Sequence, residues 1–206
     1  MNDRPAAASQ PADTASRILD VAEGLAQTRG FNGFSYADIA AVLGIRKASL
    51  HHHFPTKAEL GRALLERYAV AFGEALKAID SDGGDAYDKL VRYVQLYDQV
   101  MVRDRLCLCG MLAAEYSTLP RPMQEAVRRF FEENERWLTK LVEEGRRGGS
   151  LRPGAPARDV ARVLISALEG AMLLARSYED PSRFSAVVQP MLADLRPGTL
   201  RKKRRK

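Results

Sequence analysis

Apolar residues recur three or four positions apart along most of the chain, the spacing of one face of an α-helix. The strict alternation of apolar and polar residues that marks strands is scarce. In residues 14–29, Ile18, Ala22 and Ala26 share a face, and Gly30 is a typical stop signal after the last turn. The pattern predicts an all-α fold.

Two short helices joined by a glycine-containing turn follow the first. Ser35 can cap the second helix, which ends at Gly44. A third helix is expected over residues 46–54, where Leu50 and Phe54 face inward because they are four residues apart. Two such helices packed on a third form a helix-turn-helix, whose second helix enters the major groove of DNA.

The rest of the chain is also helical. Thr56 and Glu59 form a capping box that begins a fourth helix reaching about residue 79. Five further helices, separated by Pro and Gly, are expected over residues 86–103, 106–119, 123–147, 157–178 and 182–195. We therefore expect about nine helices in four parts: a flexible arm (1–13), a three-helix helix-turn-helix domain (14–60), a C-terminal helical bundle (61–196) and a basic tail (197–206).

Composition limits the class of protein. A chain of 206 residues with 46% hydrophobic content can build a globular core. The longest apolar stretch, residues 160–175, is interrupted by Arg162 and Glu169, so we expect no membrane-spanning helix, which needs about 20 apolar residues. Residues 1–13 lack the apolar segment of a secretory signal, and we therefore expect a cytoplasmic protein.

The net charge of +6 comes from one place. The basic run RKKRRK at residues 201–206 accounts for the whole excess of the 32 Lys and Arg over the 26 Asp and Glu. The run is either a solvated end or a source of nonspecific affinity for phosphate. Basic composition therefore supports DNA binding only weakly, and the order of residues has to carry the argument.

The polar side of the helix-turn-helix carries side chains suited to DNA. Lys47 can donate to guanine or to phosphate, Ser49 to either, and the histidines to phosphate oxygens. Lys57, with the amides of the first turn of the fourth helix, offers a second phosphate clamp. A plain helical hairpin with a polar face would show the same periodicity. The candidate DNA-binding residues are Ser35, Tyr36, Arg46, Lys47, Ala48, Ser49, His51, His52, His53, Thr56 and Lys57.

Residue order over 14–60 favours DNA binding over the plain hairpin. It resembles the N-terminal DNA-binding domain of the TetR family of bacterial regulators. The matches are Ile18-Leu19-Asp20-Val21-Ala22, Gly30-Phe31, Phe34-Ser35-Tyr36, Ile39-Ala40, Leu43-Gly44-Ile45, Ala48-Ser49-Leu50, His53-Phe54 and Lys57. The resemblance implies a repressor that binds a palindromic operator in double-stranded DNA as a homodimer formed through the last two helices. It also implies a pocket for a small-molecule effector within residues 61–196.

Two positions depart from the family pattern. Ser or Thr is usual where Arg46 stands, so the third helix must be capped from elsewhere, and the arginine can contact DNA instead. A Tyr is common at His51, and its loss weakens one phosphate contact or makes it depend on pH. The three adjacent histidines cannot converge on one ion, because consecutive helical positions fan out around the axis. We expect no metal and no cofactor.

An effector pocket would lie among aromatic, methionine and cysteine side chains, although such side chains more often form ordinary core. The candidate ligand-binding residues are Tyr93, Tyr97, Cys107, Cys109, Met111, Tyr116 and Trp137. Residues 107–115 resemble a helix of a TetR subgroup that includes sensors of reactive electrophiles and of small acids such as acrylate, which implies a thiol-reactive or a small apolar or acidic inducer. We favour the alternative that both cysteines are small buried hydrophobes, since no Lys or His lies within a turn to promote the thiolate.

Two other classes of function compete with a regulator. An enzyme is disfavoured because the chain has no phosphate-binding Gly loop, no nucleophile elbow and no metal-ligand spacing. A helical adaptor that does not bind DNA would leave Lys47, Ser49 and Lys57 without a role.

The small and apolar residues of 157–178 and 182–195 suit a two-fold interface, and core packing within one chain would show the same pattern.

Overall fold

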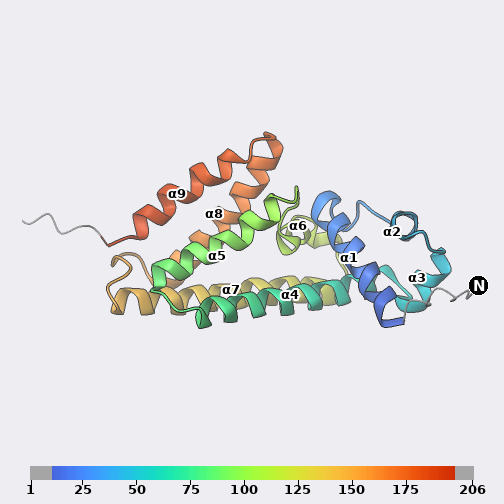
Figure 1. Cartoon of the computed structure of the whole chain (residues 1–206), viewed down its shortest axis with the longest axis horizontal. Helices are drawn as coiled ribbons and strands as arrows, with labels where there is room; N and C mark the ends of the chain where they lie inside the picture. Colours follow the sequence, from blue (N-terminus) through green and yellow to red (C-terminus); the bar gives the residue numbers. More distant parts are fainter. Residues whose placement is uncertain (1–10, 198–206) are drawn as a thin grey trace, which may run out of the picture. The chain divides into compact units, whose positions relative to one another are not determined.

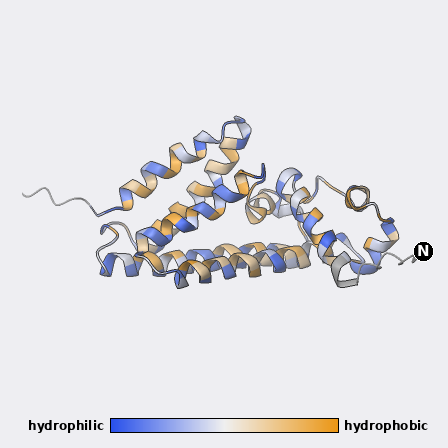
Figure 2. Cartoon of the chain, viewed as in Figure 1, coloured by the Kyte–Doolittle hydropathy of each residue, from blue (hydrophilic) through white to orange (hydrophobic). Residues whose placement is uncertain are grey.

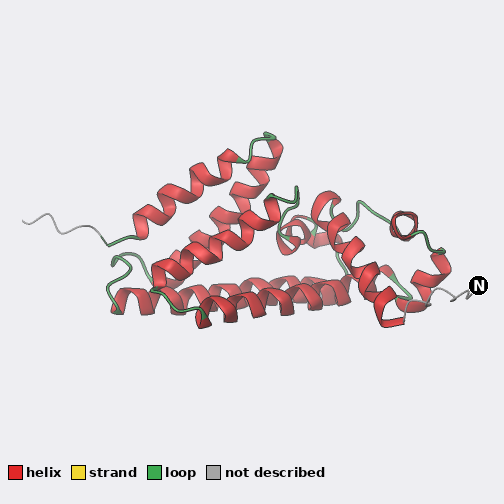
Figure 3. Ribbon diagram, viewed as in Figure 1, coloured by secondary structure: helices red, strands yellow, loops and turns green. Residues whose placement is uncertain are grey.

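The computed structural model describes residues 11–197, and all regular structure in this range is helical (Figure 3). The prediction of an all-α fold is confirmed. Residues 1–10 of the predicted arm and residues 198–206 of the predicted basic tail lie outside the described residues. Residues 11–13, which were expected to be part of the arm, belong to the first helix.

Nine α-helices and one short 3-10 helix follow one another within residues 11–197 (Figure 1). They are α1 (Pro11–Arg29), α2 (Tyr36–Leu43), α3 (Lys47–His53), α4 (Lys57–Ser81), α5 (Ala86–Met101), α6 (Leu108–Ala114), η1 (Tyr116–Thr118), α7 (Arg121–Arg147), α8 (Ala157–Ser177) and α9 (Ser182–Leu195). This agrees with the nine or so helices expected. None of the described helices has the length and hydropathy needed to cross a membrane.

The largest departure from the predicted helices lies between residues 106 and 123. The single helix expected over 106–119 is divided into α6 and η1, with Glu115 between them at φ −99° and ψ 10°. The following helix α7 begins two residues earlier than expected, because the Pro120 carbonyl accepts hydrogen bonds from the backbone of Met123 (2.9 Å) and Gln124 (3.1 Å). Pro122 is tolerated in the first turn, where its missing N–H would have no helical partner.

Close backbone contacts divide the chain into two compact units. We call the first the head unit; it contains described residues up to Tyr68 and residues 108–127. The second, the bundle unit, contains residues 69–107 and those from 128 onward. The head unit thus extends beyond the boundary near residue 60 that the sequence suggested, and it includes α6, η1 and the start of α7.

The core of the head unit consists of residues that the helical pattern placed inside. Ile18, Ala22 and Ala26 on α1 are fully buried. Leu50 is fully buried and Phe54 is 9% exposed, so the prediction that this pair faces inward is confirmed. Because α3 is held through these apolar contacts, its opposite side is left free to face a ligand as large as a DNA duplex.

The connection between α1 and α2 is held by a carboxylate far away in the sequence. Glu115 accepts hydrogen bonds from the backbone N–H groups of Phe31 (2.6 Å) and Asn32 (3.2 Å). The side chain of Asn32 donates a further hydrogen bond to Thr118 Oγ1 at 2.7 Å. Gly30 precedes these residues with a φ of +81°, and a Cβ there would lie 2.6 Å from Glu115 Oε1. Residue 30 therefore has to be glycine for two reasons, its backbone conformation and its close approach to Glu115.

Apolar residues of α8 and α9 pack against each other inside the bundle unit. Leu164, Leu168 and Met172 on α8 are buried, as are Phe184 and Val188 on α9. Hydrophobic and hydrophilic residues alternate along both helices (Figure 2), so each helix has a second side that this packing does not use.

Replacing Gly30 with Ala should reduce the free energy of unfolding by about 2–3 kcal/mol, because it adds left-handed strain and pushes the Glu115 carboxylate off two amides. Gly44→Ala is the matched control: its φ is +65°, but a Cβ there meets nothing within 4 Å. The control should lose only about 1 kcal/mol. Urea denaturation of both variants measures the difference, and equal losses would show that the Glu115 contact contributes nothing.

Candidate nucleic-acid interface and effector site

Side-chain caps at both ends of α2 set the turn that leads to α3. Ser35 Oγ accepts a hydrogen bond from the Ala37 amide at 3.2 Å, and the Asp38 carboxylate accepts one from the Ser35 amide at 2.7 Å. At the other end, Gly44 adopts φ +65° and donates its N–H to the Ala40 carbonyl. Ser35, predicted to contact DNA, is therefore also the residue that begins α2, and its side chain remains exposed.

We call α3 the reading helix, because it is the second helix of the helix-turn-helix. Its exposed side carries positive charges. Arg46, Lys47 and Ala48 are exposed at its N-terminal end. The Arg46 side chain makes no capping hydrogen bond, as expected from its departure from Ser or Thr, and remains available to a ligand. Ser49 is half-buried, and its amide donates to the Arg46 carbonyl at 2.9 Å.

Two aromatic rings fix the orientation of α3. Tyr36 is buried and donates its hydroxyl hydrogen to the Phe54 carbonyl at 2.6 Å. Burial, with a smaller contribution from Glu59, raises the pKa of Tyr36 to about 12, so the phenol stays protonated and keeps donating. The His51 ring packs on Tyr36 with centroids 4.8 Å apart, and its Nδ1 lies 3.2 Å from the Pro55 carbonyl oxygen. Tyr36 thus positions the reading helix from inside.

The remaining predicted DNA contacts lie around the start of α4 and the end of α3. His52 is exposed and His53 half-buried, with their rings edge to face. Thr56 is exposed and forms the predicted capping box: its amide donates to Glu59 Oε2 at 2.9 Å, and the Glu59 amide donates to Thr56 Oγ1 at 3.2 Å. Within the described residues, no group of three His, Cys, Asp or Glu is arranged to hold a metal ion.

Lys57 has partners that the sequence did not suggest. Its ammonium donates hydrogen bonds to the carbonyls of Phe31, at 2.5 Å, and Phe34. The charge also lies over both phenyl rings, 4.6 Å and 4.4 Å from their centroids. Burial lowers the pKa of Lys57, while Glu115 and Asp38 oppose that shift. In this conformation Lys57 holds the α1–α2 connection and does not extend to solvent as a phosphate clamp would.

The bundle unit collects four of the seven candidate ligand-binding residues. Tyr93 stacks on Trp137, with centroids 5.5 Å apart, and its ring is also 5.5 Å from that of Tyr97. Phe72, which the sequence did not single out, contacts Tyr93 and Tyr97 edge to face. Cys107 is 2% exposed and acts electrostatically on both tyrosines. We call Tyr93, Tyr97, Trp137, Cys107 and Glu169, described next, the aromatic–acid cluster.

A chain of hydrogen bonds runs through the tyrosines of this cluster. Tyr93 donates to Asn134 Oδ1 at 3.1 Å, and Tyr97 lies 3.1 Å from the Tyr93 oxygen, to which it must donate because the Tyr93 proton is already used. Asn134 in turn donates to the Phe130 carbonyl at 2.9 Å. Burial raises the pKa of both tyrosines well above the ordinary value, so they remain neutral donors.

Glu169 on α8 is the functional candidate that sequence reasoning missed. The residue as a whole is half-buried, but its carboxyl group is enclosed, and burial raises its pKa to about 7, with a hydrogen bond from Cys107 opposing the shift. Its Oε1 atom is inaccessible to solvent and has no hydrogen-bond partner among the described residues. The signal was present in the sequence as a charge that interrupts the apolar run 160–175.

The other three candidate ligand-binding residues belong to the head unit. Cys109 is fully buried, Met111 is half-buried and Tyr116 is 40% exposed. Cys107 and Cys109 therefore fall in different units, although one residue separates them. Both thiols are buried, as the alternative of small buried hydrophobes requires.

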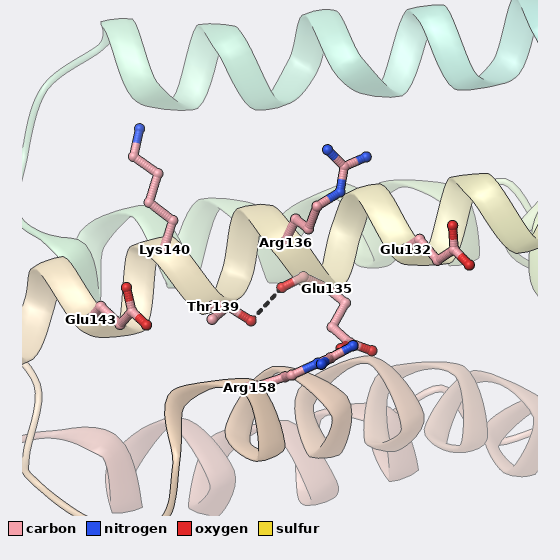
Figure 4. A pocket seen from close by; sticks show the side chains of 7 residues that line it. All are labelled: Glu132, Glu135, Arg136, Thr139, Lys140, Glu143 and Arg158. Atoms are coloured by element: carbon pink, nitrogen blue, oxygen red, sulfur yellow. Dashed lines mark hydrogen bonds and ion pairs between the residues drawn. The ribbon is translucent and has the colours of Figure 1, made fainter.

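A cleft of about 510 Å³ lies over α7 and the start of α8 in the bundle unit, and it contains none of the predicted ligand residues (Figure 4). Its lining is charged. Glu135 pairs there with Arg158 at 2.5 Å and with Arg162 at 3.3 Å. Because these charges neutralise one another on an exposed surface, the cleft offers no specific reason to bind an effector.

Comparison with known proteins agrees with the helix-turn-helix. Residues 18–64 match the family of bacterial regulatory proteins called the tetR family, and residues 86–191, more than half the chain, match the tetracyclin repressor-like C-terminal domain. A solved TetR-family regulator from Agrobacterium tumefaciens is 34% identical, with a TM-score of 0.87 covering 91% of this chain and 100% of that one.

Two curated relatives are similar over most of their length. The transcriptional repressor DhaR of Mycobacterium sp. (strain GP1) is 29% identical over 78% of this chain and 82% of its own. The transcriptional repressor NemR of Escherichia coli (strain K12) is 28% identical over 88% of this chain and 94% of its own.

The fold and the exposed reading helix define the chain as a helix-turn-helix DNA-binding regulator of transcription rather than an enzyme. It belongs to the TetR family, as residue order over 14–60 had suggested.

Replacing Lys57 with Met tests its structural role. The substitution keeps the length of the side chain but leaves two carbonyls without a charged donor, so the free energy of unfolding should fall by about 2 kcal/mol. The slope of log affinity for DNA against log salt concentration should stay unchanged, whereas loss of a phosphate contact would reduce it by about 1. An unchanged stability with a reduced slope would restore the phosphate-clamp interpretation.

Proposed function

We propose that this protein is a transcriptional repressor that binds a palindromic operator as a homodimer and is released from it by a small-molecule effector. The observation that carries the DNA-binding part is the anchored α3 with exposed Arg46 and Lys47 beside its N-terminus. The N-terminal residues of a recognition helix are those that reach base edges in the major groove. Repression, rather than activation, is inferred from the names of the relatives DhaR and NemR.

The proposed contacts divide into two kinds. Arg46, Lys47 and the exposed His51 and His52 offer donors to bases and phosphates. Tyr36 and Lys57 act behind them by holding α3 and the α1–α2 connection in place. The first group should determine sequence preference and salt dependence, and the second should determine whether the reading helix is presented at all.

Dimerisation is supported by apolar side chains that remain exposed along the last two helices. On α8, Val163, Leu173, Leu174 and Tyr178 just after its end are 45–61% exposed, and Val187 on α9 is 39% exposed. Gly170 lies among them with open space where a Cβ would be. A second copy of the chain would cover this face and form a two-fold four-helix contact. Such a dimer presents two reading helices to half-sites about 34–36 Å apart.

Release from the operator requires that the effector binds better to a conformation in which the two reading helices no longer match that spacing. We place the effector at the aromatic–acid cluster of the bundle unit. A thiol-reactive inducer at Cys107 was one hypothesis from the sequence. Cys107 is only 2% exposed, which supports the alternative that it is a small core residue. Its thiol also donates a hydrogen bond to Glu169.

Lys47→Ala should weaken binding to an operator selected from random DNA by about tenfold at moderate salt, because one base or phosphate contact is lost. Lys77→Ala removes another exposed lysine, which pairs with Glu74 on α4, and should bind as the wild type does. Fluorescence anisotropy over a series of salt concentrations measures both variants. No enriched palindrome in the selection, or wild-type affinity for Lys47→Ala, would refute the proposed reading helix.

Leu174→Glu should convert the dimer to a monomer, because it places a charge in an apolar two-fold contact. Operator affinity should then fall by about a hundredfold or more as the two half-sites are bound independently. Val70→Glu on α4, where valine is 65% exposed, is the matched control and should remain dimeric. Sedimentation velocity decides: a Leu174→Glu dimer of unchanged stability would exclude this face as the interface.

A further inference from the structure

The unpartnered oxygen of Glu169 is not explained by packing or by DNA binding. Buried polar atoms in folded proteins nearly always have a hydrogen-bond partner, because leaving one without a partner is costly. Oε1 of Glu169 is inaccessible and unpartnered, while the nearby Asn134 has both a donor and an acceptor satisfied. The difference indicates that Glu169 is kept for a group that comes from outside the chain.

The titratable neighbours of Glu169 are Cys107, Tyr93 and Tyr97, none of which can carry a positive charge. Cys107 donates its hydrogen bond to the carboxyl, and the groups that act electrostatically on Tyr93 and Tyr97 are Glu169, Cys107 and each other. The protons of both tyrosines are already engaged in the chain that ends at Asn134. The site therefore lacks a donor for the second carboxyl oxygen, and the electrostatic contributions around it favour positive charge.

A cleft of about 380 Å³ lies in the same unit, and its lining includes residues close in sequence to Cys107 and residues on the helix that carries Glu169. One wall contains Leu106, which immediately precedes Cys107. The other wall contains Arg176, which lies two helical turns, about 10 Å, beyond Glu169 on the same face of α8, with Met172 between them. Both walls therefore belong to the segments that carry Cys107 and Glu169, although neither residue lines the cleft itself.

Two backbone positions support a functional reading of this cleft. Asp104 and Glu179, which line it, are the non-glycine residues with positive φ among the described residues, at +54° and +52°. Strained residues of this kind gather at ligand sites. Their acidic side chains are balanced in the cleft lining by Arg105 and Arg176, whereas Glu169 Oε1 has no hydrogen-bond partner among the described residues.

We propose that the bundle unit binds an organic ammonium compound, with its charged nitrogen donating to Glu169 Oε1 and its apolar body lying past Met172 in the cleft beside Leu106. This proposal rests on the proposed function only in taking the bundle unit as the effector-binding part. An ammonium supplies the missing donor and neutralises the buried carboxylate. A carboxylate ligand would instead be repelled by Glu169 and would lose its hydration without gaining a donor.

Three probes that share one apolar body test the proposal: 4-phenylbutylamine, 4-phenylbutanol and 4-phenylbutyrate. Binding to the full chain, without DNA, is measured by calorimetry and by the emission of Trp137, the one tryptophan of the sequence, which stacks on Tyr93. The amine should bind at least about tenfold more tightly than the butyrate. Glu169→Gln, which keeps the shape of the side chain, should abolish that preference, and Glu143→Gln, an exposed glutamate on α7, should preserve it.

The wild-type pH dependence gives a second measurement that needs no variant. Because Glu169 has a pKa of about 7 and the amine stays protonated, affinity for the amine should rise about tenfold from pH 6 to pH 8. Affinity for the alcohol should change by less than about twofold over the same range. Tyr93 and Tyr97 remain protonated over this range because burial raises their pKa. The other charged or titratable groups near the site are Cys107 beside Glu169 and Asp104, Arg105, Arg176 and Glu179 in the cleft.

Three results would overturn the proposal: butyrate binding as tight as amine binding, an amine preference that survives in Glu169→Gln, or no binding of any probe at millimolar concentration. Operator binding by the unliganded protein is measured separately. Its loss would refute the regulator, whereas normal operator binding with no amine preference would refute only the ammonium site.

Discussion

The short connection between α1 and α2 depends on two charged side chains of opposite sign. Glu115 binds its amides at Phe31 and Asn32, and Lys57 binds its carbonyls at Phe31 and Phe34. Backbone groups in such a connection have no helical partners, so these two side chains supply the hydrogen bonds that a helix would otherwise supply. Because α2 begins directly after this connection, the direction of the whole reading motif follows from the two ion-assisted clamps.

Local signals in the sequence were enough to place the reading helix but not to explain what holds it. Ser35 and Gly44 mark the ends of α2 through caps that depend only on near neighbours, and the inward Leu50 follows from periodicity. Lys57 looked like a phosphate ligand because its residue type suits that role equally well. Its contacts span 23 and 26 residues, and the Glu115 contacts span 83 and 84, so no pattern within one helix could reveal them.

The same limit explains the error in the helix expected over 106–119. Its apolar spacing continues smoothly through residue 115, and only the proline at 120 gives a local reason to stop, because it forces Leu119 into an extended conformation. The structure ends α6 earlier, at Ala114, where the next residue turns its carboxylate to the α1–α2 connection. Likewise the two cysteines share a short sequence motif but belong to different units, a division that sequence spacing does not show.

Buried polar groups in the bundle unit separate structural from functional residues. Asn134 and the two tyrosines form a closed chain in which each named donor has an acceptor, as expected of a network that specifies one packing. Glu169 has the same surroundings and lacks that closure, so it costs stability in the unliganded protein. A hydrophobic residue of similar size would have packed the run 160–175 without that cost. The proposed ammonium ligand would remove this cost only while it is bound, so the energetic cost of the unpartnered carboxyl would become a bias between two states of a ligand-controlled regulator.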